Sequence, residues 1–178
     1  MLKIVLIAVP IAVALLGLVI AIQPGAFRIT RSARLSAPAA ELFAVVNDFR
    51  RWKAWSPWEG LDPALKRNYS GSSAGAGAIY SWAGNSQAGE GRMTILESQP
   101  NDFIRIRLEF LKPFAATHTA EFNFKPEGDQ TIVTWSMFGD RNFLAKVFGL
   151  VMNFDKMIGG QFERGLTQMQ SAVEAVRE

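Results

Sequence analysis

The side chain with the clearest chemical potential is His118, the single histidine of the chain. In the alternating stretch 118–124 it falls on the apolar face, together with Ala120 and Phe122. An imidazole in an apolar pocket could donate or accept a hydrogen bond, or move a proton. The alternative is a core histidine whose polar atoms are satisfied within the protein. The residues alone leave both interpretations open.

The spacing of the other polar residues indicates no further catalytic or metal-binding motif. The chain has no cysteine and one histidine, which excludes a disulfide framework, a thiolate metal site and a His-rich metal site. It lacks a Gly-x-Ser-x-Gly elbow, and the glycine-rich stretch 71–77 lacks the Lys-Ser/Thr ending of a P-loop. Glu59 and Asp62 have no other potential metal ligands near them in the sequence. We therefore predict neither metal nor cofactor. Most other carboxylates are expected on solvated strand edges or polar faces, namely Glu90, Glu97, Asp102, Glu109 and Glu121.

Two arginines, Arg105 and Arg107, share the polar face of one predicted strand and could contact phosphates. Glu109 and Glu121 dilute the positive charge of that face, so a solvated sheet exterior is favoured. RNA binding would require aromatic side chains on the same face, and here they occupy the opposite one. The net charge of +3 is also mild. We predict no nucleic-acid partner.

Three of the five tryptophans lie in the short stretch 48–60, which reads DFRRWKAWSPWEG. Trp52 and Trp55 are three residues apart and would share one face of a helix, which we expect to pack inward. Trp58 follows Pro57 and is predicted at the rim of a pocket. A membrane-interface position for Trp58 is the alternative, because tryptophan favours that boundary.

Apolar–polar alternation, which is typical of half-buried strands, recurs along most of the chain. It predicts a first strand at residues 27–35, then a short helix at 39–46 and a second one that carries Trp52 and Trp55. Strand-sized segments follow with no helix between them, and turn residues separate several of them. Such a succession predicts an antiparallel sheet with one buried face. The segments are residues 66–70, 77–83, 90–99, 103–110, 118–124 and 131–138.

The C-terminal part is predicted to be helical. Apolar residues recur at three- and four-residue spacing from Phe143 to Phe154, and Gly159-Gly160 is expected to break the helix. The final helix after this break is the only element long enough to cover the apolar face of the sheet. Its apolar stripe consists of Phe162, Leu166, Met169, Val173 and Val176.

The N-terminal residues 4–22 form an uncharged apolar run. As a helix this run would reach about 28 Å, close to the thickness of a hydrocarbon core. It predicts an uncleaved membrane-spanning helix, so that residues 1–24 form an anchor and residues 25–178 the folded domain. A cleaved signal peptide is the alternative, although residues 21–24 make a poor cleavage site.

Basic residues near the predicted span favour one orientation. Lys3 precedes the run, whereas Arg28, Arg31 and Arg34 follow it. The larger number of basic residues is expected on the cytoplasmic side. The prediction is therefore a single-pass membrane protein whose folded domain lies in the cytoplasm.

The order of elements and several local patterns resemble the SRPBCC superfamily, which has the START-like helix-grip fold. Within it the chain is most similar to bacterial polyketide cyclase/dehydratase-like proteins. The resemblance covers roughly residues 27–176. It rests on residues 36–43 (SAPAAELF), 48–52 (DFRRW), 55–58 (WSPW), 162–166 (FERGL) and the turn near Pro100.

The resemblance implies an α+β fold, in which a curved seven-stranded antiparallel sheet wraps around a long C-terminal helix and two short helices follow strand 1. It also implies a mostly apolar cavity between the sheet and that helix, which in the superfamily holds lipids, polyketides or other hydrophobic molecules. Catalysis is not implied, because many members only bind or carry.

Bulky and adaptable side chains over one concave sheet favour such a cavity. We therefore predict binding of a lipid, isoprenoid or polyketide-like molecule. One alternative is a cyclase, dehydratase or hydrolase that uses His118 as acid or base, and another is an interaction or stress-response protein with a filled core. The predicted cavity wall comprises Trp55, Trp58, Tyr80, Trp82, Met93, Phe110, His118, Phe122, Trp135, Met137, Phe162, Leu166 and Met169.

Overall fold

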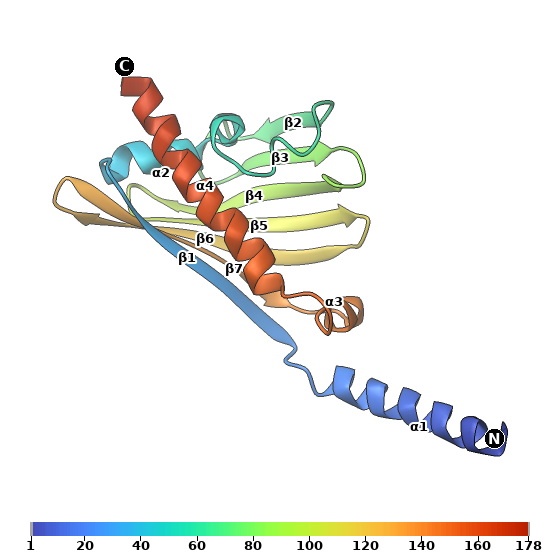
Figure 1. The fold of residues 1–178 in the computed structure, drawn as a ribbon. Helices are drawn as coiled ribbons and strands as arrows, with labels where there is room; N and C mark the ends of the chain where they lie inside the picture. The colour runs from blue at the N-terminus through green and yellow to red at the C-terminus, as the bar shows by residue number, and fades with distance from the viewer. Residues whose placement is uncertain (1, 178) are drawn as a thin grey trace.

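The computed structural model describes residues 2–177, with side chains for residues 9–11 and 14–177. Figure 1 shows an N-terminal helix, a broad sheet and a long helix that crosses the sheet. The elements are α1 (Leu2–Ala21), β1 (Ala26–Leu35), α2 (Ala39–Asn47), the 3₁₀ helix η1 (Phe49–Ala54), β2 (Lys66–Gly71), β3 (Ala78–Ala83), β4 (Glu90–Gln99), β5 (Phe103–Lys112), β6 (Ala116–Glu127), β7 (Gln130–Asp140), α3 (Phe143–Phe148) and α4 (Phe154–Arg177).

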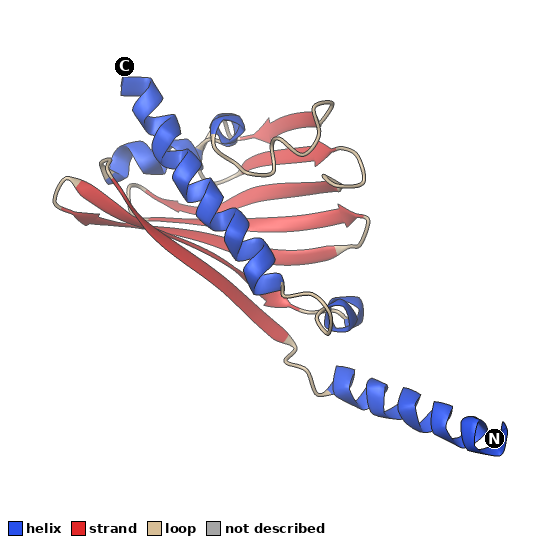
Figure 2. Ribbon diagram, in the orientation of Figure 1, coloured by secondary structure: helices blue, strands red, loops and turns tan. Residues whose placement is uncertain are grey.

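The seven strands form one antiparallel sheet in the order β1-β7-β6-β5-β4-β3-β2. Because side chains alternate across a strand, each strand sends its apolar residues to one face. Ile104 and Ile106 of β5 and Phe122 of β6 are fully buried there. Helix α4 lies across this inner face (Figure 2). The sheet and the long C-terminal helix agree with the predicted helix-grip arrangement.

Helix α4 is longer than predicted, because it continues through Gly159-Gly160 instead of starting after them. The reason lies in Arg31 of β1, whose guanidinium donates hydrogen bonds to Asp155 (2.9 Å) and Glu163 (2.7 Å) of α4. A Cβ atom at Gly159 would lie within 2.1 Å of this guanidinium. Gly159 therefore permits close approach of the arginine and does not end the helix.

The predicted transmembrane helix at residues 4–22 is contradicted. Within the part of the chain that the structure describes, no helix is both long and apolar enough to cross a membrane. The prediction rested only on an apolar run of sufficient reach, and the side chains of residues 4–8, 12 and 13 lie outside the described ones. The same finding contradicts the predicted localisation as a single-pass membrane protein and the membrane as a partner through a span at residues 4–22.

Gly165 of α4 lies against two side chains of the core. A Cβ atom there would be 2.8 Å from Cζ3 of Trp135 and 3.1 Å from Cδ of Pro57. We predict that Gly165→Ala lowers the free energy of unfolding by about 1–3 kcal/mol through overpacking. This loss would outweigh the better helix propensity of alanine, about 1 kcal/mol.

Gly160 is the matched control, because it belongs to the same helix and a Cβ there would meet nothing within 4 Å. Gly160→Ala should raise the free energy of unfolding by up to about 1 kcal/mol. Urea denaturation measures both variants. Equal stabilisation by the two substitutions would contradict the packing of Trp135 against α4.

Candidate functional site

Two of the three clustered tryptophans lie in the core. Trp52 belongs to η1 and Trp55 follows it directly, and both are almost fully buried. Their indole N–H groups donate to the carbonyl oxygens of Val46 (2.8 Å) and Val45 (3.1 Å) at the end of α2. These bonds satisfy the polar atom that a buried tryptophan carries. The expected inward packing of both side chains is present, and it joins α2 to η1.

Beneath α4 the inner face of the sheet is filled with stacked rings. The Trp135 ring lies between Phe162 of α4, at 4.2 Å between centroids, and Phe122 of β6, at 4.7 Å. Trp58 is half-buried and meets Trp135 edge-on at 5.4 Å. Trp58 therefore packs partly into this stack, and its predicted position at the rim of a pocket stays a prediction.

The predicted wall residues divide into two groups by burial. Whether either group lines a ligand site stays a prediction at this point. Four are only half-buried, namely Trp58, Trp82, Phe110 and His118. The others are buried core side chains, namely Trp55, Tyr80, Met93, Phe122, Trp135, Met137, Phe162, Leu166 and Met169.

Half-buried rings form a row across the inner face, near the end of the sheet where β3, β5 and β7 finish. We call Trp82, Phe110, His118 and Phe27 the aromatic row. Neighbouring ring centroids are 6.1 Å apart between Trp82 and Phe110 and 6.0 Å between Phe110 and His118. His118 and Phe27 meet edge-on at 4.9 Å. The row brings together side chains from β3, β5, β6 and β1.

Two glycines within strands make room for this row. Gly91 of β4 pairs with Trp82, and a Cβ atom there would lie 2.3 Å from the indole. In β7, a Cβ at Gly139 would lie 2.6 Å from Nδ1 of His118. Both rings therefore lie close against a neighbouring strand that has no side chain at that position. Glycine inside a strand pattern signals such close approach, and this signal could have located the row from the sequence.

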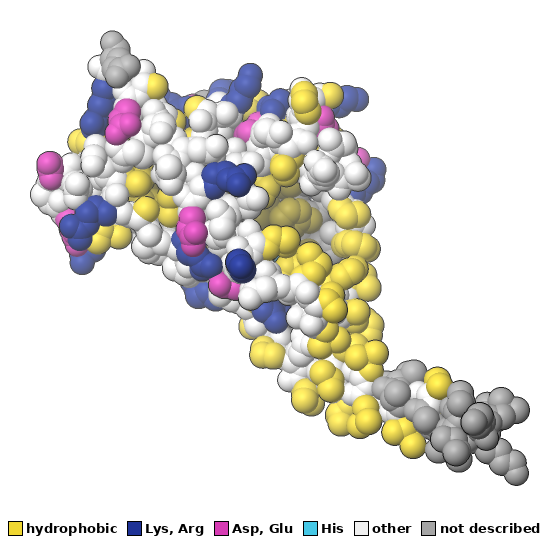
Figure 3. Space-filling model, in the orientation of Figure 1, with side chains coloured by type: hydrophobic (Ala, Val, Ile, Leu, Met, Phe, Trp, Pro, Cys, Tyr) yellow, Lys and Arg dark blue, Asp and Glu magenta, His cyan; other side chains and the backbone are white. Residues whose placement is uncertain are grey.

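A hollow opens over this end of the sheet. Figure 3 shows it beside α4, over the inner face of β4 and β5, with hydrophobic atoms at its floor and along its rim. The turn after β5 and helix α3 meet at this rim, where the rings of Phe114 and Phe148 are 6.3 Å apart. Large apolar side chains at this end are exposed to solvent, namely Phe114, Phe143, Leu144, Phe148, Leu150, Val151, Met152 and Met157.

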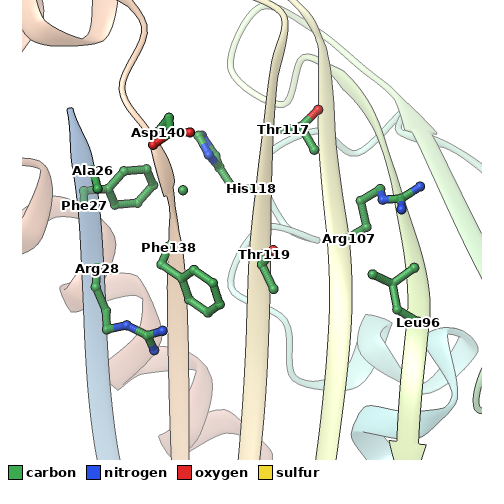
Figure 4. A pocket seen from close by; sticks show the side chains of 11 residues that line it. Ala26, Phe27, Arg28, Leu96, Arg107, Thr117, His118, Thr119, Phe138 and Asp140 are labelled. Carbon is green, nitrogen blue, oxygen red and sulfur yellow. The ribbon is translucent and has the colours of Figure 1, made fainter.

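His118 is the polar member of the row. Its Nδ1 atom is buried against Gly139 and has no hydrogen-bond partner among the described residues. Burial lowers the pKa of the imidazole below its ordinary value. The Thr117 backbone and the negative charge of Asp140 act in the opposite direction but offset only part of this decrease. Figure 4 shows the imidazole near Phe27 and Asp140. The side chain is therefore neutral at pH 7.

Glu59 carries a polar network that the sequence did not predict. The Tyr80 hydroxyl donates to Glu59 Oε1 at 2.7 Å, and Arg67 Nε donates to Oε2 at 2.6 Å. Burial and the bond to the carboxylate raise the pKa of Tyr80. The network holds the segment after Trp58 onto β2 and β3. No spacing rule reveals it, because Glu59 lies in a turn far from Tyr80 in the chain.

Metal binding finds no support in the described residues. No three His, Cys, Asp or Glu side chains lie close enough together there to hold an ion. The Glu59 carboxylate accepts hydrogen bonds from Arg67 and Tyr80. Asp62 accepts hydrogen bonds from the backbone N–H groups of Ala64 and Asn85. Both carboxylates therefore stabilise the turn after the tryptophans.

We predict that His118 titrates below its ordinary pKa of 6.5. As pH falls from about 6.5, the unfolded chain takes up a proton before the folded one does, so the free energy of unfolding decreases. The full free energy of unfolding is therefore present above pH 6.5. It decreases as the pH falls from 6.5 toward the pKa that His118 has in the folded protein. Asp155, whose pKa is lowered by Arg31, acts only at lower pH.

The single histidine gives one imidazole signal, so an NMR titration reads its pKa directly. Urea denaturation at several pH values gives the stability slope, and His118→Gln should flatten it between pH 6.5 and 5. A pKa at or above 6.5 would contradict the burial of the ring.

Comparison with known proteins places the chain in a family. The family model described as "Polyketide cyclase / dehydrase and lipid transport" matches residues 26–174. No curated protein is detectably similar to the chain.

Solved structures share the fold at low sequence identity. Protein CV1439 from Chromobacterium violaceum is 16% identical, with a TM-score of 0.58 and coverage of 85% of this chain and 99% of that one. A Thermobifida fusca protein is 20% identical, with a TM-score of 0.60 and coverage of 82% and 92%. The Aha1 dimer from Colwellia psychrerythraea is 13% identical, with a TM-score of 0.58 and coverage of 83% and 96%. Because the family model spans the whole sheet and most of α4, the chain belongs to the polyketide cyclase/dehydrase and lipid transport family.

Proposed function

We propose that this protein binds an uncharged, ring-containing hydrophobic molecule in the hollow over the aromatic row. The observation that carries the proposal is the row itself. Four rings remain half-buried at one end of a sheet whose middle is tightly packed. Ligand sites are typically concave and apolar, with few polar groups. The family, whose description includes lipid transport, supports small-molecule binding in general.

The chemistry of the row favours a flat, neutral ligand. Trp82, Phe110 and Phe27 offer ring surfaces, which prefer offset or edge-on contact with another ring. None of the four side chains in the row carries a charge, because the imidazole of His118 is neutral. A carboxylate or phosphate placed over this floor would lose its hydration without gaining a partner. Fatty acids and phospholipid headgroups therefore fit the row poorly.

One polar anchor lies within the apolar floor. Because Nδ1 of His118 is buried against Gly139, the imidazole can meet a ligand only through Nε2. A hydroxyl or carbonyl group on the ligand would pair with this atom and fix its orientation. Gln161 of α4 also has a buried Oε1 atom without a partner among the described residues. An acid or base role for His118 stays a prediction.

The rim suggests how an apolar molecule enters. Phe114 and Phe148 meet at the open end, and Phe143 is 67% exposed. A contiguous apolar rim of this kind is unusual on a monomeric protein and marks a contact site. It would allow a poorly soluble ligand to reach the hollow with little exposure to water.

We expect the neutral fluorescent probe N-phenyl-1-naphthylamine to bind in this hollow. Phe110→Ser removes a ring from the floor and should weaken probe binding by about tenfold. Fluorescence titration measures the affinity, and circular dichroism checks that the variant is folded. Extraction of the purified protein followed by mass spectrometry should also yield a neutral ring compound.

Leu111→Ser is the matched control, because Leu111 is the next residue of β5, points to the other face and is 58% exposed. Its effect on probe affinity should stay within about twofold. A folded wild-type protein that takes up no probe and yields no compound would rule out the proposal. So would equal weakening by both substitutions.

A further inference from the structure

The outer face of the sheet carries a second row of side chains, directly behind the aromatic row. Arg107 of β5 pairs with Thr119 of β6, Thr119 pairs with Phe138 of β7, and Phe138 pairs with Arg28 of β1. These four residues are direct cross-strand partners, so they form a straight line across four strands. We call them the outer row. His118 and Thr119 are successive residues and point to opposite faces.

The arginines of this face that lie outside the outer row are paired with carboxylates. Arg92 donates to both carboxylate oxygens of Glu109 at 2.9 Å, and Arg105 donates to Glu97 at 2.7 Å. Arg34 lies 2.8 Å from a carboxylate oxygen of Glu127. These arginines are therefore neutralised within the protein.

Arg107 and Arg28 are different. In the described part of the chain, Arg107 has neither an ion-pair partner nor a side-chain hydrogen bond. Arg28 comes only within 3.8 Å of Glu121, a carboxylate that already accepts a 3.0 Å hydrogen bond from Arg105. The guanidinium of Arg28 lies 3.9 Å from the ring centre of Phe138, which fixes it along the row. Two incompletely neutralised guanidinium groups therefore flank Thr119 and Phe138.

A shallow groove follows the outer row. Its volume is about 680 Å³. Besides the outer row, the lining includes Leu96, Thr117 and Asp140 and, at the edge next to the aromatic row, Ala26, Phe27, His118 and Gly139. Figure 4 shows Arg28, Phe138, Thr119 and Arg107 succeeding one another across the strands, with Leu96 beyond Arg107. The groove thus combines two cations, two hydroxyl groups and apolar surface. Asp140 lies at its far end, next to Gly139, and would repel an anion there. The favourable region is therefore centred on Thr119 and Arg107.

We infer that this groove binds a phosphoryl group. Arg107 supplies a planar set of N–H donors that matches phosphate geometry, and threonine hydroxyl groups can donate to the remaining oxygens. Phe138 and Leu96 provide apolar contact for whatever the phosphate is attached to. The side chains of the outer row point to the opposite face of the sheet from the hollow, so this inference does not require the ligand proposed there.

Two probes separate a free phosphate from a lipid headgroup. Inorganic phosphate and dihexanoyl phosphatidic acid are titrated separately at constant ionic strength, and backbone amide NMR shifts are followed at Arg107, Thr117 and Thr119. We expect saturable shifts at these residues. Arg107→Gln should weaken binding by about tenfold or more, because it removes charge-assisted hydrogen bonds.

Arg92→Gln is the matched control, since Arg92 lies on the same face but is held by Glu109. It should change the affinity by no more than about twofold. Tighter binding of phosphatidic acid than of phosphate would support a lipid headgroup as occupant, and equal affinities would support a free phosphate group. Shifts that do not saturate with either probe would overturn the inference, and so would equal losses in both variants, which would indicate only a general charge effect.

Discussion

The fold depends on the packing of Trp135 between Phe122 and Phe162, at 4.7 and 4.2 Å between ring centres. This stack fixes the distance between α4 and the sheet. It requires glycine at position 165, because a Cβ atom there would overlap the indole. Near the start of α4, Arg31 holds the helix to β1 through Asp155 and Glu163. The helix is thus fixed both by packing and by ion pairs.

This packing limits the free space on the inner face of the sheet. The middle of the inner face is occupied by rings from η1, β6, β7 and α4, and protein interiors packed in this way leave little space. The end of the sheet beyond the stack is covered less completely, and there the aromatic row remains half-buried. The resemblance to a ligand-binding superfamily predicted a cavity beneath the last helix. The site that we propose is displaced toward the open end.

The same end of the sheet presents different chemistry on its two faces. Alternation along β6 sends His118 to the apolar inner face and Thr119 to the charged outer face. Because the pleat couples them, a change of conformation in β6 would reach both faces. The glycines Gly91 and Gly139 belong to this arrangement, since they allow large rings to cross neighbouring strands without clash.

Alternation together with turn residues predicted all seven strands, because a sheet with one buried face repeats every two residues and its strands are separated by turns. The start of α4 was predicted wrongly, because the role of Gly159 depends on Arg31, a residue far away in the chain. The membrane span was predicted from hydropathy alone, and the described helices do not support it. Core and cavity wall could not be separated from the sequence, since both consist of the same apolar residue types. Trp135 is buried beneath Phe162 of α4, whereas Trp82 is only half-buried.

The most direct test of the account compares the tryptophan indole signals in an NMR titration with N-phenyl-1-naphthylamine. The chain has five tryptophans. Trp82 belongs to the aromatic row and its N–H donates to Ala88, whereas Trp52 and Trp55 donate to Val46 and Val45 in the core. A ligand over the aromatic row should produce a saturable shift of the Trp82 indole signal and leave those of Trp52 and Trp55 unchanged. Shifts at Trp52 and Trp55 without one at Trp82 would place the ligand beneath α4 and contradict a site at the open end.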